Sequence, residues 1–304
     1  MIEVPDMVRQ KAAHLGEPGE RWLANLPDRL VEVAAAWDLT LGRPFTGGSA
    51  SYTTRARTAD GEDVVLKLVA PGLDTASQVR TIAAADGNGY VRLLAHADDA
   101  LLLEALGPEL DLPPEQSIAV LARLLRQAWL PPAEPAQAKA DGLGAFVEEL
   151  WHKNNGPTSR HAFDEAMRCA ERRTAADDPS THVVVHGDPH PGNALRVLTP
   201  RAGAETGYAF VDPEGFVTDP AYDLGVVLRD WCDELLAAPD PRALARRYSA
   251  LLAEHSGLSE AAVWEWGFLE RMSTGLYLLD FAGPAAAAPF LRTADLLAGA
   301  TLSA

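Results

Sequence analysis

The residues best suited to chemistry lie in one short segment, His186-Gly187-Asp188-Pro189-His190-Pro191-Gly192-Asn193. The three valines at 183–185 are typical of a buried strand, and the prolines and glycines that follow exclude a helix. We therefore expect Asp188 and Asn193 on a rigid loop at a strand end. A carboxylate there can accept the proton of an attacking hydroxyl, and an amide oxygen can bind the Mg²⁺ that bridges nucleotide phosphates. This pair suits phosphoryl transfer.

A second candidate metal ligand follows another predicted strand. The apolar residues 208–211 are typical of a strand, and Asp212 opens the turn Asp212-Pro213-Glu214-Gly215 directly after it. We expect Asp212 to supply a second metal-binding side chain. Glu214 is a candidate for a further contact with the metal or with a substrate.

Other interpretations of the first segment stay open. His182, His186 and His190 are spaced by four residues, which on a helix would form a face suited to zinc, although the valines and prolines argue against that helix. Asp188 and Asn193 could instead form a purely structural turn in which Asp188 caps local amides. His190 could contact Asp188, bind a phosphate or be structural.

Lys67 is the basic residue whose position most suggests a ligand. Of the four lysines in the chain, it alone lies inside an apolar run, 64–68. Burying an unpaired ammonium is costly, so Lys67 needs a partner, which nucleotide phosphates would provide. The alternative is an edge-strand lysine that reaches solvent. Upstream, the loop Gly47, Gly48 and Ser49 could also approach phosphates, although such a loop alone is more often a hairpin turn.

Composition limits the class of protein. The net charge of −17 opposes binding to nucleic acid or anionic membranes and would attract a cationic small molecule, although an acidic surface can also serve solubility alone. No stretch is apolar over the roughly 18 residues of a membrane span, and the N-terminus does not resemble a signal peptide. We expect a soluble, cytoplasmic monomer. Cys169 and Cys232 suggest neither a disulfide nor a metal site, and we expect both to be buried helix residues.

The coarse pattern predicts a small sheet-rich region followed by a mainly helical one. In the first region the pattern predicts a helix at 28–37, strands at 52–58 and 64–69, a helix at 74–85 and a strand beginning at 101. Farther along it predicts helices at 114–129, 143–153, 161–173, 223–236, 241–255, 259–282 and 285–300, with a linker at 131–140.

The block His-Gly-Asp-x-x-x-x-Asn, followed by an Asp after an apolar strand, resembles the catalytic and metal loops of the aminoglycoside phosphotransferases, small-molecule relatives of protein kinases. Further segments resemble the streptomycin 6-phosphotransferase and hydroxyurea-resistance kinase branch, so that the resemblance covers nearly the whole chain. These segments are Pro5-Asp6, 19–23, 91–94, 101–104 and 219–224.

The resemblance implies an α+β, two-lobed protein-kinase-like fold, with a small antiparallel-sheet N-lobe at 1–103, a hinge at 104–108 and a mainly helical C-lobe at 109–304. It implies ATP and Mg²⁺ as cofactors. Lys67 would hold the α- and β-phosphates, and backbone groups around Glu104 and Leu106 would bind the adenine edge. The chain departs from the kinase pattern where the helix at 74–85 lacks a glutamate for Lys67, so that Gln78 or Asp74 must replace it.

The resemblance also implies supporting and acceptor-binding residues. Asp223 would brace the catalytic loop by accepting backbone amides, with His186 as further support. The acceptor pocket would lie between the late helices and the catalytic loop, although solvated helix faces would give the same sequence pattern. The candidate acceptor residues are Glu214, Asp230, Trp231, Asp233, Glu234, Glu270 and Asp280.

These observations favour an ATP-dependent O-phosphotransferase that acts on an aminoglycoside, with streptomycin at its 6-hydroxyl as the expected acceptor and antibiotic resistance as the outcome. Asp188 would orient and deprotonate the hydroxyl, while Asn193 and Asp212 would hold Mg²⁺. One alternative is a kinase for another hydroxylated acceptor, such as hydroxyurea or a metabolite, because the motifs leave the acceptor open. The other is a nucleotide-binding pseudokinase that acts as an interaction module, which the missing helix glutamate favours.

Overall fold

The computed structural model describes residues 3–45, 51–72, 74–133 and 139–299. The chain divides into two compact units. The N-terminal unit comprises Met1–Pro108 together with Arg196–Ala209, and the C-terminal unit comprises Glu109–Leu195 together with Phe210–Ala304. The segment 196–209, which we expected in the C-lobe, therefore clusters with the N-terminal unit.

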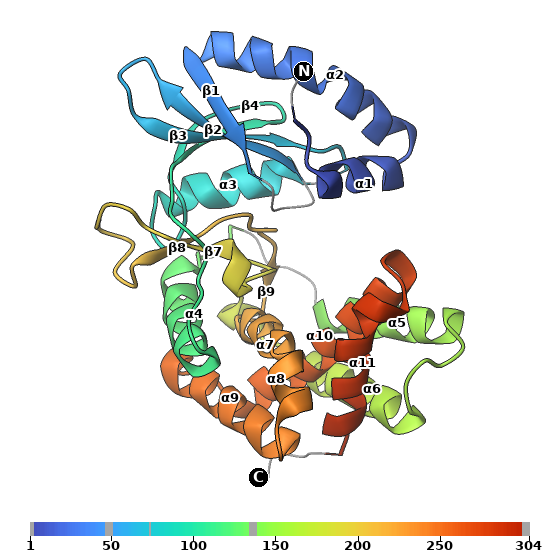
Figure 1. The fold of residues 1–304 in the computed structure, drawn as a ribbon. Coiled ribbons are helices and arrows are strands. Elements are labelled where there is room, and N and C mark those ends of the chain that lie inside the picture. Colours follow the sequence, from blue (N-terminus) through green and yellow to red (C-terminus); the bar gives the residue numbers. More distant parts are fainter. Residues whose placement is uncertain (1–2, 46–50, 73, 134–138, 300–304) are drawn as a thin grey trace. The chain divides into compact units, whose positions relative to one another are not determined.

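The N-terminal unit is built on a five-stranded antiparallel sheet with strand order β1-β2-β3-β5-β4 (Figure 1). Its strands are β1 (Leu39–Pro44), β2 (Ser51–Thr58), β3 (Asp63–Val69), β4 (Leu93–Ala97) and β5 (Ala100–Glu104). Its helices are α1 (Asp6–His14), α2 (Glu17–Ala36) and α3 (Thr75–Ala85). The expected helix at 28–37 therefore begins earlier, at Glu17, after Gly16 in the left-handed region and with a proline in its first turn.

Alternation along β3 decides what each face of the sheet contacts. Leu66 and Leu68 are fully buried and pack with Leu26 and Leu30 of α2 in one apolar cluster. Because successive side chains of a strand point to opposite faces, Lys67 points to the other face, which α3 covers (Figure 1). β3 lies between β2 and β5, so the edge-strand alternative for Lys67 is wrong.

Arg201 explains why residues 196–209 belong to the N-terminal unit. Its guanidinium forms an ion pair with Glu104 at the end of β5, and it donates hydrogen bonds to the carbonyls of Gly87 and Tyr90. The Arg201 side chain is only 8% exposed, so these partners compensate a buried charge. The segment thus folds back onto residues that precede the expected hinge.

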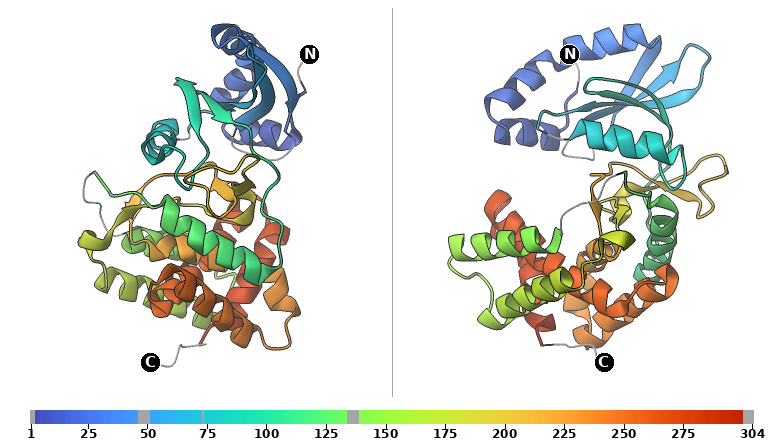
Figure 2. Two further views of the ribbon diagram at one scale, coloured as in Figure 1. Left: turned by 90° about the vertical axis from the view of Figure 1, so that its left-hand side faces the viewer. Right: turned by 180° about the vertical axis from the view of Figure 1, so that it is seen from behind.

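The C-terminal unit is mainly helical (Figure 2). Its helices are α4 (Pro114–Ala128), α5 (Lys139–Lys153), α6 (Arg160–Ala175), α7 (Ala221–Asp230), α8 (Cys232–Ala237), α9 (Pro241–Ser256), α10 (Glu260–Phe281) and α11 (Pro284–Leu297). Its short strands are β6 (Val183–Val184) and β9 (Val217–Thr218). Two further short strands, β7 (Ala194–Arg196) and β8 (Tyr208–Phe210), pair with each other and contain residues of both units. Helix α10 contacts α5, α6, α7, α9 and α11, so it forms the centre of the helical core.

The single helix expected at 223–236 is wrong, because the chain breaks at Trp231 into α7 and α8. In a continuous helix the Leu228 carbonyl would accept the amide of Cys232. Here the buried Arg271 of α10 donates Nη2 to that carbonyl at 2.6 Å and Nη1 to the Cys232 sulfur at 3.0 Å. A side chain from another helix therefore ends α7. Both cysteines are buried and unbonded to each other, as expected.

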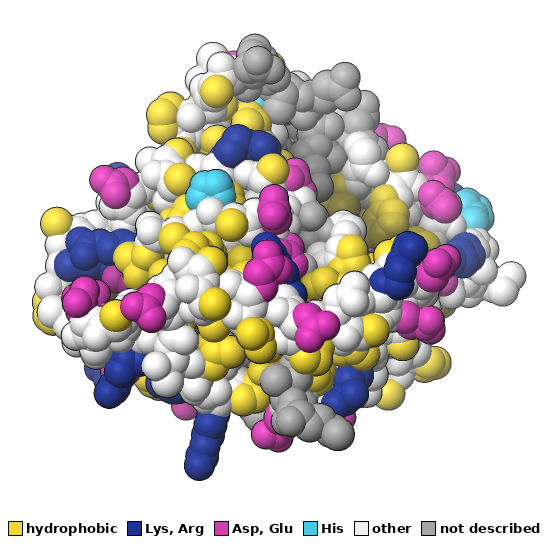
Figure 3. All heavy atoms as spheres, turned by 90° about the horizontal axis from the view of Figure 1, so that it is seen from above, with side chains coloured by type: hydrophobic (Ala, Val, Ile, Leu, Met, Phe, Trp, Pro, Cys, Tyr) yellow, Lys and Arg dark blue, Asp and Glu magenta, His cyan; other side chains and the backbone are white. Residues whose placement is uncertain are grey.

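Charged side chains are dispersed on the surface that Figure 3 shows, where Asp and Glu lie among basic and apolar side chains. Within the described part of the chain, no helix is both long enough and apolar enough to span a membrane.

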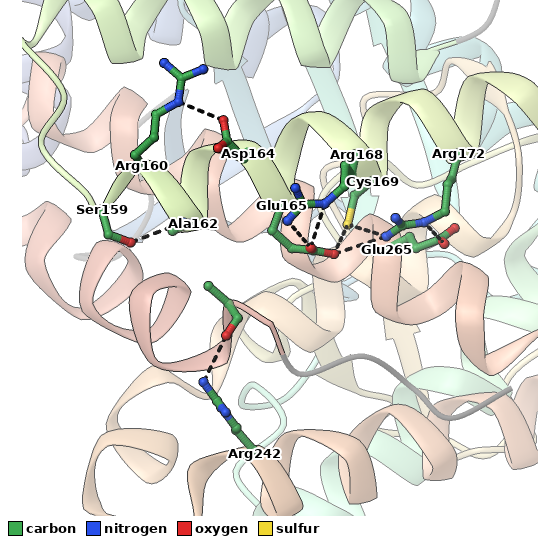
Figure 4. A network of polar contacts seen from close by, with 11 residues as sticks. Ser159, Arg160, Ala162, Asp164, Glu165, Arg168, Cys169, Arg172, Arg242 and Glu265 are labelled. Carbon is green, nitrogen blue, oxygen red and sulfur yellow. Dashed lines mark hydrogen bonds and ion pairs between the residues drawn. The ribbon is translucent and has the colours of Figure 1, made fainter.

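A buried ion network joins α6 to α10 (Figure 4). Glu165 accepts hydrogen bonds from Arg168 and Arg172, and Glu265 of α10 pairs with Arg172 and Arg173. Both glutamates are buried, and removing one partner of such a group leaves an uncompensated charge. The network therefore fixes how α6 packs on the central helix.

We predict that Gly225→Ala strongly destabilises the protein. An added Cβ would lie 2.4 Å from the Trp266 Cβ and 2.7 Å from the Gly267 amide, where α7 and α10 pack together. Such overpacking should lower the free energy of unfolding by about 2–3 kcal/mol.

Gly142→Ala in α5 is the matched control, because an added Cβ there meets nothing within 4 Å. Removing this helical glycine should raise the free energy of unfolding by about 0.5–1 kcal/mol. Denaturant unfolding measures both changes, and equal effects of the two alanines would contradict the packing described for α7 and α10.

Candidate active site

The loop that carries Asp188 is fixed by one buried carboxylate. Asp223, in the first turn of α7, accepts the amides of His186 and Gly187, each at 2.8 Å. The same carboxylate accepts the indole N–H of Trp129 at 2.9 Å. Burial raises the pKa of Asp223 to about 7, although the three hydrogen bonds that its carboxylate accepts oppose that rise. The loop conformation thus depends on a side chain from a different element.

His186 connects this loop to the strand end that carries Asp212. Its Nε2 lies 2.9 Å from the Val211 carbonyl, and its Nδ1 accepts the Asp188 amide at 3.1 Å. We therefore infer the neutral ring with the proton on Nε2. Both ring nitrogens contact backbone groups, so His186 cannot bind zinc, and no cluster of three His, Cys, Asp or Glu side chains in the described ranges is placed to hold a metal.

Asn193 and Asp212 are brought near each other where β7 and β8 meet the loop. The Val211 amide donates to the Asn193 carbonyl at 2.9 Å, which aligns the two strand ends. The Asn193 side-chain amide donates Nδ2 to the Asp188 carbonyl at 2.9 Å, so its side-chain oxygen is the atom that could bind a metal. Asp212 has a φ of 59°, a left-handed conformation that is uncommon outside glycine.

The donor set of Asn193 and Asp212 fits Mg²⁺. Both side chains offer oxygen, which is the donor that Mg²⁺ prefers, and two protein ligands suffice because this ion usually keeps waters and substrate phosphates in its remaining positions. If bound, the metal would neutralise charge on a nucleotide's phosphates.

Asp188 is held from several sides. Its backbone amide and carbonyl are fixed by His186 and Asn193, and its Oδ1 accepts a hydrogen bond from Arg229 Nη2. Its Oδ2 lies 3.5 Å from His190 Nε2, while His190 Nδ1 accepts the Gly192 amide. One ring nitrogen of His190 therefore supports the loop backbone, and the other faces Asp188, the expected base. The alternative in which Asp188 only forms a structural turn by capping local amides is wrong, because the Asp188 side chain contacts Arg229 instead.

Our sequence reasoning missed Arg229. It lies on α7, where it contacts Glu270 Oε2 at 2.9 Å and lies 3.6 Å from Asp230 as well as touching Asp188. The available signal was a single cation that directly follows the apolar run 226–228 of that helix. Nothing in the sequence spacing linked it to residues 41 positions away.

The seven acceptor candidates do not form one group. Glu270 and Asp230 surround Arg229, and Trp231 is buried against Tyr248. Asp280 pairs with Lys153 at 2.8 Å and lies ten residues beyond Glu270 on α10, or about 15 Å along the helix. The remaining three candidates, all exposed, are Glu214, Asp233 and Glu234.

Lys67 has a partner on α3. Its Nζ lies 3.1 Å from Gln78 Oε1, and the residue is buried at 4% exposure. Asp74 instead caps α3 by accepting the Ser77 amide, and hydrogen bonding to the Ser77 side chain and amide lowers the pKa of Asp74. Gln78 therefore stands where the kinase pattern has a glutamate.

The remaining expected nucleotide contacts are placed in part. The Glu104 carboxylate is held by Arg201 and the Arg92 amide, so this side chain is structural. Leu106 is buried. On either side of it, the Glu104 amide donates a hydrogen bond to the Arg92 carbonyl and the Gly107 amide donates one to the Arg196 carbonyl. Gly47, Gly48 and Ser49 lie outside the described residues.

A family model and three related sequences point to the same kinase family. Residues 37–277 match the family described as aminoglycoside/hydroxyurea antibiotic resistance kinase. A streptomycin 6-kinase from Streptomyces glaucescens is 28% identical over 92% of this chain and 92% of its own length. One from Streptomyces griseus is 28% identical over 98% of this chain and 97% of its length. A hydroxyurea phosphotransferase from Kitasatospora aureofaciens is 27% identical over 74% of this chain and 67% of its length.

Solved structures agree on the fold. A thermostable mutant of an aminoglycoside phosphotransferase, in a ternary complex with ADP and hygromycin B, superposes with a TM-score of 0.58 at 16% identity, covering 90% of this chain and 98% of its own. A macrolide 2′-phosphotransferase from Brachybacterium faecium gives 0.54 at 18% identity, covering 91% and 100%. The expected protein-kinase-like α+β fold, with an antiparallel sheet and a mainly helical part, is confirmed.

We predict that His186 makes stability depend on pH. Burial lowers the pKa of His186 from 6.5 to about 4. Between pH 6.5 and about 4 the His186 ring binds a proton in the unfolded chain but not in the folded chain, so acidification over this range favours unfolding. Between pH 7.5 and 5.5 this should remove about 1.3 kcal/mol from the free energy of unfolding.

The measurement is denaturant unfolding of the wild type and His186→Asn at both pH values, which lie above the sequence pI of about 4.8. The wild type should lose about 1.3 kcal/mol more than the variant. His96→Asn, at an exposed position, is the control and should retain the wild-type dependence. Equal losses in the wild type and His186→Asn would show that His186 is not the titrating group.

Proposed function

This chain belongs to the aminoglycoside/hydroxyurea antibiotic resistance kinases, and from that premise we propose that it transfers the γ-phosphate of ATP to a hydroxyl of streptomycin. Phosphotransfer follows from the family, whose match covers residues 37–277. The 6-hydroxyl is the proposed acceptor, because two relatives that align over more than nine-tenths of this chain are streptomycin 6-kinases.

The observation that carries the proposal is the Asp188 carboxylate on a loop fixed by Asp223. Asp188 Oδ1 forms an ion pair with Arg229, and about one-third of the Asp188 side chain is exposed. A carboxylate held in this way can orient an acceptor hydroxyl and take its proton as the phosphoryl group arrives. Most of the rate would come from positioning, because the transition state for phosphoryl transfer is loose.

The family resemblance assigns donor-side roles to residues of each unit, taken separately. In the N-terminal unit, Lys67 would bind the α- and β-phosphates and Leu106 backbone groups would bind the adenine edge. In the C-terminal unit, Asn193 and Asp212 would hold Mg²⁺. A related phosphotransferase of the same fold binds ADP, which supports an adenine nucleotide as the donor.

The acceptor side is supported by charge. A net charge of −17 favours a cationic acceptor over an anionic one, and streptomycin carries basic guanidino groups. Exposed carboxylates at Glu214, Asp233 and Glu234 could bind such groups through charge-assisted hydrogen bonds. The pseudokinase alternative loses its main support, since Gln78 already provides Lys67 with a partner.

The test is ADP release with Mg²⁺-ATP and streptomycin, run beside a panel of other aminoglycosides and hydroxyurea. We expect streptomycin-dependent turnover that stops when EDTA removes the metal. Asp188→Asn should reduce kcat at least about 100-fold, the usual share of general base catalysis, while MgATP still raises the melting temperature. If only hydroxyurea supports turnover, streptomycin is not the acceptor and hydroxyurea takes its place. Nucleotide binding without turnover on any acceptor would favour the pseudokinase.

We predict that Gln78 contributes to catalysis through Lys67. Gln78→Leu removes a hydrogen-bond acceptor that positions a buried ammonium, which should lower kcat/KM for ATP by roughly 10–100-fold. Gln78→Glu restores an acceptor and should stay within about threefold of the wild type, as the kinase pattern implies. The KM for streptomycin should not change. An unchanged kcat/KM for ATP in Gln78→Leu would remove Lys67 from the nucleotide site.

A further inference from the structure

Arg229 is a buried cation inside the candidate active site. Its side chain is 15% exposed, and the neighbouring carboxylates that keep it charged are Asp188, Glu270 and Asp230. Although burial disfavours the charged form, these carboxylates hold the pKa of Arg229 above its ordinary value. The guanidinium is therefore a fixed positive charge in contact with the proposed base.

Glu270 fixes the far side of that guanidinium. It lies on α10 with only 3% of its surface exposed, and its Oε2 is 2.9 Å from Arg229 Nη1. Burial and the nearby Glu270 carboxylate raise the pKa of Tyr222, which lies seven residues before Arg229 and thus on the same face of α7. Arg229 is held between the central helix and Asp188, so its Nη2 has little freedom to move.

The Asp188 carboxylate is held most closely by Arg229, and its side-chain contact with His190 is longer. Its backbone is fixed by His186 and Asn193, but those bonds leave rotation about the side-chain torsions open. Of its two oxygens, Oδ1 is bound to Arg229 while Oδ2 lies 3.5 Å from His190. The contact with Arg229 therefore selects which oxygen faces outward.

We propose that Arg229, held by Glu270, is the positioning residue that orients Asp188 so that Oδ2 receives the acceptor hydroxyl. The inference deepens the proposed phosphotransfer and rests on it. It assigns Glu270 to Arg229 rather than to the acceptor. A stabilising role alone does not account for the cluster, because buried ion pairs are often no more stable than apolar replacements.

The kinetic test compares Arg229→Ala, Arg229→Lys and Glu270→Gln with the wild type. Arg229→Ala should lower kcat by about 100-fold, the usual cost of a misplaced catalytic group, with KM for ATP and streptomycin within about twofold. Arg229→Lys, which keeps one donor, should recover part of kcat, and Glu270→Gln should lose less than Arg229→Ala. Added guanidinium should restore kcat to Arg229→Ala but not to Asp188→Asn.

Arg271→Ala is the matched control. Arg271 is the neighbour of Glu270 and is more deeply buried than Arg229, yet it bonds Leu228, Cys232 and Thr293 instead of Asp188. Its loss should lower the melting temperature while kcat of the folded enzyme stays within about twofold and does not respond to guanidinium. Equal losses of kcat in Arg229→Ala and Arg271→Ala, or no rescue of the former, would make the role of Arg229 structural and overturn the inference.

A crystal structure of Arg229→Ala separates this inference from the proposed function. Absence of turnover by the wild type with every acceptor would refute the proposed function alone. The inference is then tested by the Asp188 rotamer, which should differ between Arg229→Ala and the wild type. An unmoved carboxylate would overturn it. If Arg229→Ala does not fold, Arg229→Lys and Glu270→Gln provide the same structural comparison.

Discussion

The hydrogen bonds from the His186 and Gly187 amides to the Asp223 carboxylate are the constraint on which the rest of the site depends. They tie the catalytic loop to the first turn of α7, and α7 packs directly on the central helix α10. The loop therefore takes its position from the helical core rather than from its own short strand. Burying this carboxylate is costly, which its raised pKa reflects, and the three hydrogen bonds that it accepts offset part of that cost.

His186 extends the same constraint to the metal-binding residues. Its ring spans from the Asp188 amide to the Val211 carbonyl, so that the loop and the strand end before Asp212 move together. The left-handed backbone of Asp212 is a strained conformation that the surrounding bonds must hold. Helix α7 contributes twice to the site, through Asp223 at its start and Arg229 near its end. One short helix thus supports the backbone of Asp188 and also fixes its side chain.

The sequence predicted most elements because their patterns are local. The apolar run that becomes β3 and the turn residues after Val185 each lie within a few residues of sequence. What it could not predict depends on contacts between distant residues. Arg271 ends α7 by taking the Leu228 carbonyl, and Arg201 carries 196–209 to Glu104. In the same way Arg229 reaches Asp188 and Glu270 from 41 positions away in each case, a relation that no local pattern encodes.

The central claim is that Asp188 on this loop directs phosphoryl transfer to a cationic acceptor. Its most direct test is mass spectrometry of streptomycin after incubation with Mg²⁺-ATP and either the wild type or Asp188→Asn. We predict a singly phosphorylated streptomycin with the wild type, modified at the 6-hydroxyl, and unmodified antibiotic with the variant. Phosphorylated streptomycin in equal yield from both proteins would contradict the account, because transfer would then not need the carboxylate around which the loop is built.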